Sequence, residues 1–557
     1  MKNLLYILKV ILLYFISLAS FSCKNYRDEV TITVRQFQVP VLKNRENNPV
    51  LQIKISVPDS DKNLNVRRFR ITSSGCDNHE DIENVQILFT GVDSLWPGNN
   101  TVKGIFGKAE KISRVLNFKG EQTLSTGDNY FWVVCNLSHS TSLYNRIDFG
   151  FSSVRITGCR KMEVIEINTG IRQRVGVAVR KHLDDNVHTY RIPGLATTKA
   201  GTLLAIYDVR RLSSRDLQGD IDIGLSRSTD GGNTWEPMRI VLDMDEWGGL
   251  PQKFNGVSDA CILVDENSGK IFVAGLWMHG VLDTAGRWIE GLTEESNAWE
   301  HQWRRKGSQP GFDVRQTSQF LITTSTDDGK TWSEPENLTR MCKRREWWLL
   351  APAPGRGITM DDGTLVFPAQ GRDEDGVPFS NIIYSLDGGL TWKTSNPAFS
   401  GTNECAVVQL DDGTLMLNMR YGQRRQGETG RAVAVTSDLG NTWREHPSSR
   451  HILREPVCMA SLLKHEYSLN GEKKHVLVFS NPDVESPPRR NITIKVSFDD
   501  GLTWPEEYYF LLDEGTGRGY SCLTSVDERT IGILYESSQA DLVFESIPLE
   551  ELLKINK

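Results

Sequence analysis

One eight-residue pattern, Ser/Thr-x-Asp-x-Gly-x-Thr-Trp, recurs five times and constrains the fold of this chain more than any other feature. It occupies residues 228–235, 325–332, 385–392, 436–443 and 497–504. An aspartate that accepts backbone N–H groups, a glycine that adopts positive φ and a tryptophan that packs between strands are typical of a tight turn in a β-hairpin. The central aspartates are 97, 60, 51 and 61 residues apart. The last three intervals suit one four-stranded unit each, and the first leaves room for an insertion. The repeats therefore predict a β-propeller.

The pattern is absent from residues 24–175, where short alternating runs predict a different all-β domain. Residues 29–35 and 51–57 alternate apolar and polar side chains, and residues 85–89 and 130–134 are short, mostly apolar runs. Polar turns separate these β-type runs, which favours a β-sandwich. Trp96 and Trp132 suit either its core or a sugar-stacking surface, so carbohydrate binding by this domain stays open. Residues 176–548 are assigned to the propeller.

Composition excludes several partner classes. The 557 residues carry a net charge of −7, so no overall basic field attracts nucleic acid. The cysteines show no zinc-type spacing, and no metal or other cofactor is expected. We expect a monomer.

The first residues have the features of an export signal. Two lysines precede a short apolar run, and residues 1–22 are assigned to a signal peptide. Cys23 follows a small residue, as in a bacterial lipoprotein cleavage site. Lipidation at Cys23 and plain secretion both stay open, so the expected location is the periplasm, the cell surface or the medium.

The motifs between the turns resemble those of exo-sialidases. The turns themselves look like the Asp boxes of that family and of unrelated propellers. More specific are Tyr190-Arg-Ile-Pro193, Asp208-Val-Arg-Arg211, Asn403-Glu-Cys405, Leu417-Asn-Met-Arg420 and Gly519-Tyr-Ser-Cys522. The resemblance covers residues 175–545. It implies an all-β chain with a six-bladed β-propeller catalytic domain preceded by a β-sandwich, acting on sialylated glycans.

The resemblance also implies a set of arginines around the carboxylate of sialic acid. Arg191, Arg420 and Arg489 would form that triad, although Arg490 is adjacent to Arg489 and remains an alternative. Guanidinium groups bind carboxylates bidentately and stay charged at any working pH. Glu536 would hold Arg191. Arg210 would lie beside the acid and the ring substituents near C4.

Three further residues would carry the chemistry, by the same resemblance. Tyr520 would attack the anomeric carbon with Glu404 as its base, and Asp216 would be the general acid and base. A neutral phenol suits this substrate, because a second anion ~4 Å from the sugar carboxylate would cost roughly 4 kcal/mol at an effective dielectric of about 20. Tyrosine is the known exception to carboxylate nucleophiles among glycosidases.

Two polar residues are expected to contact other parts of the sugar. Asp259 resembles the family residue near O4, and Gln370 lies in a segment that resembles the one lining the glycerol side chain. The main interpretation is an exo-sialidase that retains configuration through a tyrosyl-sialoside. An intramolecular trans-sialidase would share all these residues. A non-catalytic sialic-acid-binding propeller would lack Tyr520, Glu404 and Asp216.

Overall fold

A computed structural model describes residues 29–554 except 59–62, 97–101, 160, 168, 218, 279–280, 284–286, 288, 297–299, 302–307 and 425. The predicted signal peptide and Cys23 lie outside the described residues. The chain divides into two compact units, and the division is not a single cut in the sequence. Residues 38–45 and 137–146 belong to the second unit together with residues 173–557. Among the described residues, no helix is long and apolar enough to cross a membrane.

The first unit consists of two β-sheets. Six strands pair in the order β11-β1-β3-β8-β5-β6, and three pair in the order β10-β4-β7. Their bounds are Val30–Arg35 (β1), Asn48–Val57 (β3), Asn65–Thr72 (β4), Ile82–Gly91 (β5), Gly104–Ala109 (β6), Val115–Thr123 (β7), Gly127–Leu137 (β8), Gly150–Thr157 (β10) and Met162–Ile167 (β11). Trp132 is only 3% exposed and lies edge to face with Trp96, so these two rings pack with each other.

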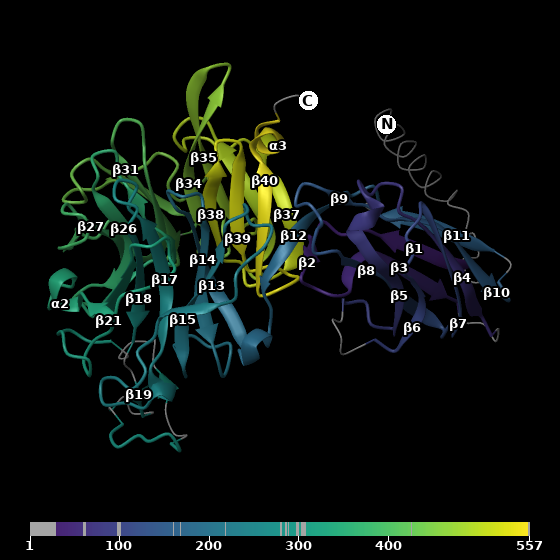
Figure 1. Ribbon diagram of the computed structural model, residues 1–557, viewed down its shortest axis with the longest axis horizontal. Helices are drawn as coiled ribbons and strands as arrows, with labels where there is room; N and C mark the ends of the chain where they lie inside the picture. Colours follow the sequence, from purple (N-terminus) through teal and green to yellow (C-terminus); the bar gives the residue numbers. More distant parts are fainter. Residues whose placement is uncertain are drawn as a thin grey trace, which may run out of the picture. The chain divides into compact units, whose positions relative to one another are not determined.

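The second unit contains six large sheets, which we call blades 1 to 6 in chain order, and the predicted all-β fold class is confirmed. In Figure 1 they follow one another from β13 (blue) through β27 and β31 (green) to β40 (yellow). The first three blades comprise β13–β16 (Thr189–Thr197, Leu203–Arg210, Ile221–Ser228, Arg239–Leu242), then β17, β18, β21, β22 and β24 (Val257–Val264, Ile271–Trp277, Gln319–Ser325, Glu336–Asn337, Gly355–Arg356), then β23 and β25–β29 (Leu349–Pro352, Ile358–Thr359, Leu365–Arg372, Pro378–Ser385, Lys393–Thr394, Phe399–Ser400).

Blades 4 to 6 follow in chain order. They comprise β30–β33 (Thr402–Gln409, Leu415–Tyr421, Ala432–Thr436, Arg444–Glu445), then β34–β37 (Ser461–Leu469, Glu472–Pro482, Arg490–Ser497, Phe510–Thr516), then β38–β40 (Ser521–Asp527, Thr530–Tyr535, Leu542–Pro548) with β12 (Gln173–Arg180) and β2 (Val41–Lys43). Short elements complete the chain: β9 (Arg146–Ile147), β19 (Val281–Leu282), β20 (Glu300–His301), α2 (Thr339–Cys342), α3 (Leu549–Leu553) and the 3-10 turns His79–Asp81, Asp184–Asn186, Gln252–Phe254 and Glu506–Tyr508.

The blades close into a ring. Successive blades contact each other through the strand pairs β13 and β17, β17 and β23, β26 and β30, β30 and β34, and β34 and β38. The last blade meets the first through β38 and β13. Blade 6 combines strands from both ends of the domain, because β12 pairs with β40 in antiparallel register. This pairing joins the start of the propeller to its end within one sheet.

Each of the five repeated turns joins the third strand of a blade to its fourth. In the turn of blade 3, the Thr391 hydroxyl and backbone N–H both donate to Asp387, at 2.6 and 2.8 Å. Blade 6 has no such turn, since its outer strand β12 comes from the other end of the domain. Five turns therefore belong to six blades.

Tryptophans of these turns pack between strands, and two of them meet an aromatic ring of the preceding blade. Trp235 of blade 1 meets Phe544 of blade 6 edge to face at 5.2 Å. Trp392 of blade 3 meets Phe272 of blade 2 at 5.7 Å. In blades 1 and 3 the repeated turn thus contributes to the packing against the preceding blade.

Candidate active site

The predicted site residues gather where the innermost strands begin. Arg191, Asp259 and Glu404 lie near the starts of β13, β17 and β30, and Tyr520 immediately precedes β38. All three strands have an irregular register at that point, between Arg191 and Gly194, Ser258 and Cys261, and Thr402 and Cys405. Such bulges redirect side chains out of the regular alternation, here toward the ring axis.

Backbone strain accompanies two of these irregularities. Ile192 has a φ of 58° and Asp259 a φ of 55°. Positive φ is unfavourable for a β-branched residue and persists only where surrounding contacts enforce it. The Ile192 N–H donates to Glu536 Oε1 at 3.0 Å, so the residue that holds Arg191 also holds the strained backbone beside it.

Eight of the ten predicted residues line one cavity of about 250 Å³. The full lining is Arg191, Ile192, Asp216, Leu217, Ser258, Asp259, Gln370, Asn403, Glu404, Arg420, Arg489 and Tyr520. The other two predicted residues, Arg210 and Glu536, are almost fully buried behind it, each 1% exposed. The volume suits a monosaccharide better than a longer glycan.

Tyr520 and Glu404 form a direct hydrogen bond at the centre of the cavity. The Tyr520 hydroxyl donates to Glu404 Oε1. Arg420 Nη1 contacts both groups, at 2.5 Å to Glu404 Oε2 and 2.9 Å to the Tyr520 oxygen. Burial raises the pKa of Tyr520 well above its ordinary value, and the nearby Glu404 charge raises it further. The cavity therefore holds a neutral phenol beside a carboxylate that can take its proton.

Arg191 is held by a bidentate ion pair. Its Nε and Nη2 donate to the two oxygens of Glu536 at 2.8 and 3.1 Å. Burial alone would raise the pKa of Glu536, but the charge and hydrogen bonds of Arg191 hold it below the ordinary value. Glu536 Oε2 also accepts the Tyr520 N–H at 3.0 Å, so one buried carboxylate fixes both the arginine and the backbone of the phenol.

Arg489 approaches Tyr520 from another direction. Its guanidinium carbon lies 5.6 Å from the Tyr520 ring centroid, and that of Arg191 lies 5.3 Å from it. Two backbone carbonyls, of Arg518 and Val457, fix the Arg489 side chain. Arg490 is exposed and does not line the cavity, so Arg489 is the member of the adjacent pair that lies at the site.

Asp216 lies on the exposed side of the cavity, in the loop between β14 and β15. Its side chain is 56% exposed and pairs with Arg210 Nη2. Arg210 was expected to lie beside the acid and the ring substituents. It does lie beside Asp216, but its guanidinium is buried and does not line the cavity.

Asp259 and Gln370 form a hydrogen-bonded pair in the cavity wall. Gln370 Nε2 donates to Asp259 Oδ2 at 3.2 Å. Burial and the neighbouring Glu404 charge raise the pKa of Asp259 well above its ordinary value. Asp259 therefore stays protonated to a higher pH than an ordinary aspartate.

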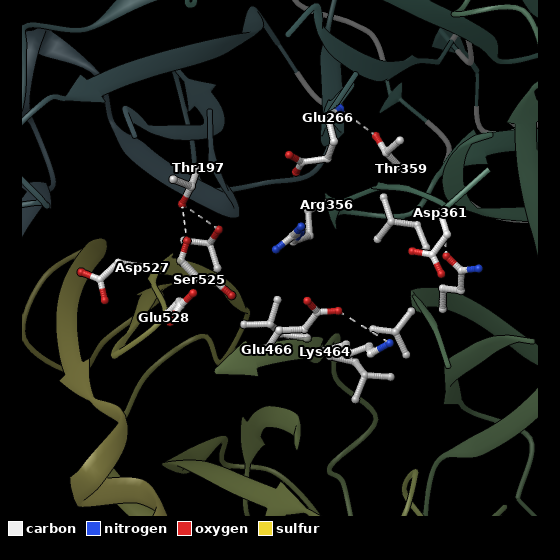
Figure 2. A pocket seen from close by; sticks show the side chains of 16 residues that line it. Thr197, Glu266, Arg356, Thr359, Asp361, Lys464, Glu466, Ser525, Asp527 and Glu528 are labelled. Carbon is white, nitrogen blue, oxygen red and sulfur yellow. Dashed lines mark hydrogen bonds and ion pairs between the residues drawn. The ribbon is translucent and has the colours of Figure 1, made fainter. Parts of the chain in front are cut away.

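A second cavity, of about 440 Å³, opens near the carboxyl ends of β13, β30 and β38 (Figure 2). Its lining has no tyrosine–glutamate pair and no cluster of arginines. Arg356 and Lys464 are its cationic side chains, and Lys464 pairs with Asp411 at 2.6 Å. Its five carboxylates belong to Glu266, Asp361, Glu466, Asp527 and Glu528. The excess of negative charge would repel a carboxylate-bearing sugar, so the smaller cavity is the candidate active site.

Sequence reasoning missed three polar residues of this region. Ser258 and Asn403 line the cavity, and Asp208 is buried behind it. Ser258 and Asn403 each immediately precede a predicted residue, and Asp208 is part of the motif that holds Arg210. Their positions in the sequence show that they are close to predicted residues, but do not reveal the contacts that their side chains make.

Comparison with known proteins identifies the family of the chain. A BNR repeat-like domain matches residues 201–533, and the N-terminal domain of BNR-repeat neuraminidase matches residues 29–159. A sialidase of Bacteroides fragilis is 42% identical over 547 residues, which cover 94% of this chain and 96% of that protein. The chain belongs to the bacterial sialidase family.

Solved structures extend the comparison to the fold. A microbial sialidase named Hadza microbial sialidase Hz136 aligns with a TM-score of 0.82 and 39% identity, over 93% of this chain and 99% of that one. A leech intramolecular trans-sialidase aligns with a TM-score of 0.55 over 88% of this chain and 94% of that one. Its identity is 16%, so this likeness concerns the fold alone.

Proposed function

We propose that this family member is an exo-α-sialidase that releases terminal sialic acid from glycoconjugates with retention of configuration. The observation that carries the proposal is the contact between the Tyr520 hydroxyl and Glu404, in a cavity that also presents three guanidinium groups. The arginines suit a sugar whose carboxylate is attached to the reacting carbon, and the phenol suits attack beside that carboxylate.

The first step transfers sialic acid to the enzyme. Glu404 takes the phenolic proton as the Tyr520 oxygen forms a bond to the anomeric carbon, and the bond from that carbon to the glycosidic oxygen breaks. Asp216 delivers a proton to the departing oxygen, so that the aglycone leaves as an alcohol. Arg191, Arg420 and Arg489 hold the substrate carboxylate throughout.

The second step returns the enzyme to its first state. Asp216, now ionised, takes a proton from a water molecule that attacks the anomeric carbon. The bond to Tyr520 breaks, and the phenolate recovers its proton from Glu404. Two inversions at one carbon give net retention.

Turnover of Tyr520→Phe tests the assignment. The variant should bind sialic acid but lose at least about 10³ in kcat, because covalent and general-base catalysis both act through that oxygen. Tyr384→Phe, on β27 of blade 3, is the matched control and should behave as wild type. Near-normal turnover by Tyr520→Phe would refute the nucleophile.

Proton NMR of a sialyllactose digest tests the reaction itself. We expect α-sialic acid to appear first and then to mutarotate. A 2,7-anhydro sugar as first product would instead identify an intramolecular trans-sialidase. Intact sialyllactose with wild-type enzyme, despite measurable binding, would identify a non-catalytic propeller.

We further propose that residues 1–22 direct export of a monomer. Lys2 and Lys9 before the apolar run, and the small residues before Cys23, support a signal peptide. Intact mass of the mature protein distinguishes a lipid-bearing Cys23 from plain secretion, and light scattering measures the oligomeric state. Retention of residues 1–22 in the exported protein would contradict the proposal.

A further inference from the structure

A buried carboxylate that the reaction does not use lies directly behind the cavity. Asp208, on β14, is 0% exposed. Its Oδ2 accepts three hydrogen bonds, from Arg210 Nε at 3.1 Å, Arg210 Nη2 at 2.8 Å and Ser258 Oγ at 2.6 Å. Asp208 Oδ1 has no hydrogen-bond partner within the part of the chain that the structure describes. The hydrogen bonds of this carboxylate therefore come from one guanidinium group and one serine hydroxyl.

The other side of the same guanidinium holds the loop that carries Asp216. Arg210 Nη2 pairs with Asp216 Oδ1, and Arg210 Nη1 donates to the Ser214 carbonyl at 2.8 Å. Asp216 itself is more than half exposed, so packing does little to fix it. Its carboxylate is positioned mainly by Arg210, and Arg210 is positioned by Asp208.

Ser258 connects this buried pair to the sugar side of the cavity. It lines the cavity, donates to Asp208 and lies 3.5 Å from Asp259 Oδ1. Asp208 and Ser258 come from different blades, since β14 belongs to blade 1 and β17 to blade 2. The contact between them therefore depends on the packing of those two blades.

We propose that Asp208 and Ser258 are positioning residues that hold Arg210, and through it Asp216, at the leaving-group oxygen. The inference rests on the proposed role of Asp216 as general acid. Without a negative partner on its buried side, the Arg210 guanidinium would turn toward the remaining carboxylate or toward water. Asp216 would then lose the geometry that proton delivery requires, because a general acid must lie within hydrogen-bond reach of the oxygen it protonates.

The dependence on leaving group separates this role from general loss of structure. An aryl sialoside, 4-methylumbelliferyl sialic acid, releases a stabilised phenolate that needs little protonation. Sialyllactose releases a sugar alkoxide that needs it strongly. Proton transfer by a positioned acid contributes about 10²–10⁴-fold. Asp208→Asn should therefore lower kcat/KM at least about tenfold more for sialyllactose than for the aryl sialoside.

Three comparison variants make the test decisive. Asp216→Ala should show a still larger difference in kcat/KM loss between sialyllactose and the aryl sialoside. Ser258→Ala should show a smaller difference of the same sign. It provides the test of the positioning role if Asp208→Asn does not fold. Glu545→Gln alters another buried carboxylate–arginine pair, between Arg174 and Glu545, and should leave the ratio of the two substrates unchanged.

Each failure has a distinct meaning. Equal losses on both substrates in Asp208→Asn and Ser258→Ala, with selective loss in Asp216→Ala, would overturn the positioning role alone. Absence of selectivity in Asp216→Ala would overturn both this inference and the proposed acid. No cleavage of either substrate by the wild type would overturn the proposed function.

Discussion

At the scale of single residues, Asp259 is a cavity carboxyl group whose surroundings disfavour its ionised form. Burial, then the charges of Glu404, Asp208 and Asp216, raise its pKa well above the ordinary value. An acid whose folded pKa is raised stays neutral to higher pH, and ionises only as the pH climbs through that pKa. When it does, it adds a negative charge to the cavity that would bind an anionic sugar.

Asp259→Asn should therefore keep most of the wild-type activity near neutral pH. The amide is isosteric with the neutral acid, so kcat/KM should fall by less than about tenfold, the worth of one neutral hydrogen bond. Asp259→Ala, which leaves Gln370 without that partner, should lose more. Profiles of kcat/KM against pH should show an alkaline decline in wild type that Asp259→Asn lacks. A collapse of Asp259→Asn at every pH would mean that the ionised form is needed.

Glu536 should affect substrate binding and turnover together, because it holds Arg191 and the Tyr520 backbone at once. Hydrogen bonds to charged groups contribute about 1.5–3 kcal/mol, so Glu536→Gln should lower kcat/KM by roughly 10–150-fold. KM should rise and kcat should fall in steady-state kinetics. Glu266→Gln, at the opposite cavity, is the control and should change neither. An unchanged KM in Glu536→Gln would remove Arg191 from carboxylate binding.

Sequence motifs placed most residues that line the cavity and two of those behind it, but they did not reveal Ser258 and Asn403 in the lining. Arg191, Glu404 and Tyr520 occur in short patterns with fixed neighbours. The contact of Asp208 with Ser258 joins residues from two blades and has no local signature. The positive φ of Ile192 is also invisible in the sequence, since a residue between Arg191 and Pro193 would ordinarily be extended.

At the scale of the repeated elements, the number of turns differs from the number of blades for a topological reason. A turn can recur in the sequence only where two consecutive strands are covalently joined. Blades 1 to 5 meet this condition at their outer hairpins, and blade 6 does not because β12 arrives from the other end of the domain. The repeats predicted a propeller, and the missing sixth turn is the consequence of its closure.

The turn aspartates should contribute stability with a defined pH dependence. Hydrogen bonds from the Thr391 hydroxyl, and then from its backbone N–H, lower the pKa of Asp387 to about 2. A depressed carboxyl pKa stabilises the fold above the unfolded pKa of about 4, and that contribution disappears as the pH falls toward 2. Asp387→Asn should thus lower Tm most at pH 5–7 and converge with wild type near pH 2.

Thermal unfolding followed by circular dichroism across pH measures this difference. Asp375→Asn, an exposed carboxylate between β26 and β27, is the control and should leave Tm unchanged at every pH. Neither variant should alter KM, because neither residue lines the cavity. A constant difference in Tm down to pH 2 would show that Asp387 acts through its shape rather than its charge.

At the scale of the whole molecule, closure of the propeller depends on segments far apart in the chain. β12 pairs with β40 on one side and in parallel with β2 on the other. Residues 38–45, which contain β2, were assigned to the first domain from sequence, because a three-residue strand has no periodicity of its own. Their place in the second unit follows from backbone pairing, which the sequence pattern could not reveal.

A buried ion pair connects β12 to β40 in blade 6, and we expect the stability of the blade to depend on it. Arg174, on β12 and 3% exposed, donates from Nε to Glu545 Oε2 on β40 at 3.1 Å and from Nη2 to the Ser546 carbonyl at 2.7 Å. Glu545 is fully buried and also accepts the Tyr535 hydroxyl at 2.7 Å. Arg174→Met would leave this carboxylate unpaired, and removing one partner of a buried pair costs about 3–5 kcal/mol.

Urea unfolding should show that cost, with a characteristic dependence on pH. Burial already raises the pKa of Glu545 above its ordinary value, against the opposing charge of Arg174. Loss of that charge raises the pKa further, so Glu545 in Arg174→Met is protonated to a greater extent at pH 5 than at pH 8. The deficit in unfolding free energy should therefore be smaller at pH 5 than at pH 8. The double variant Arg174→Met, Glu545→Gln should recover most of it, because a buried pair replaced as a unit is often near neutral. A deficit that is independent of pH and unrelieved by Glu545→Gln would show that Arg174 contributes through its packing instead.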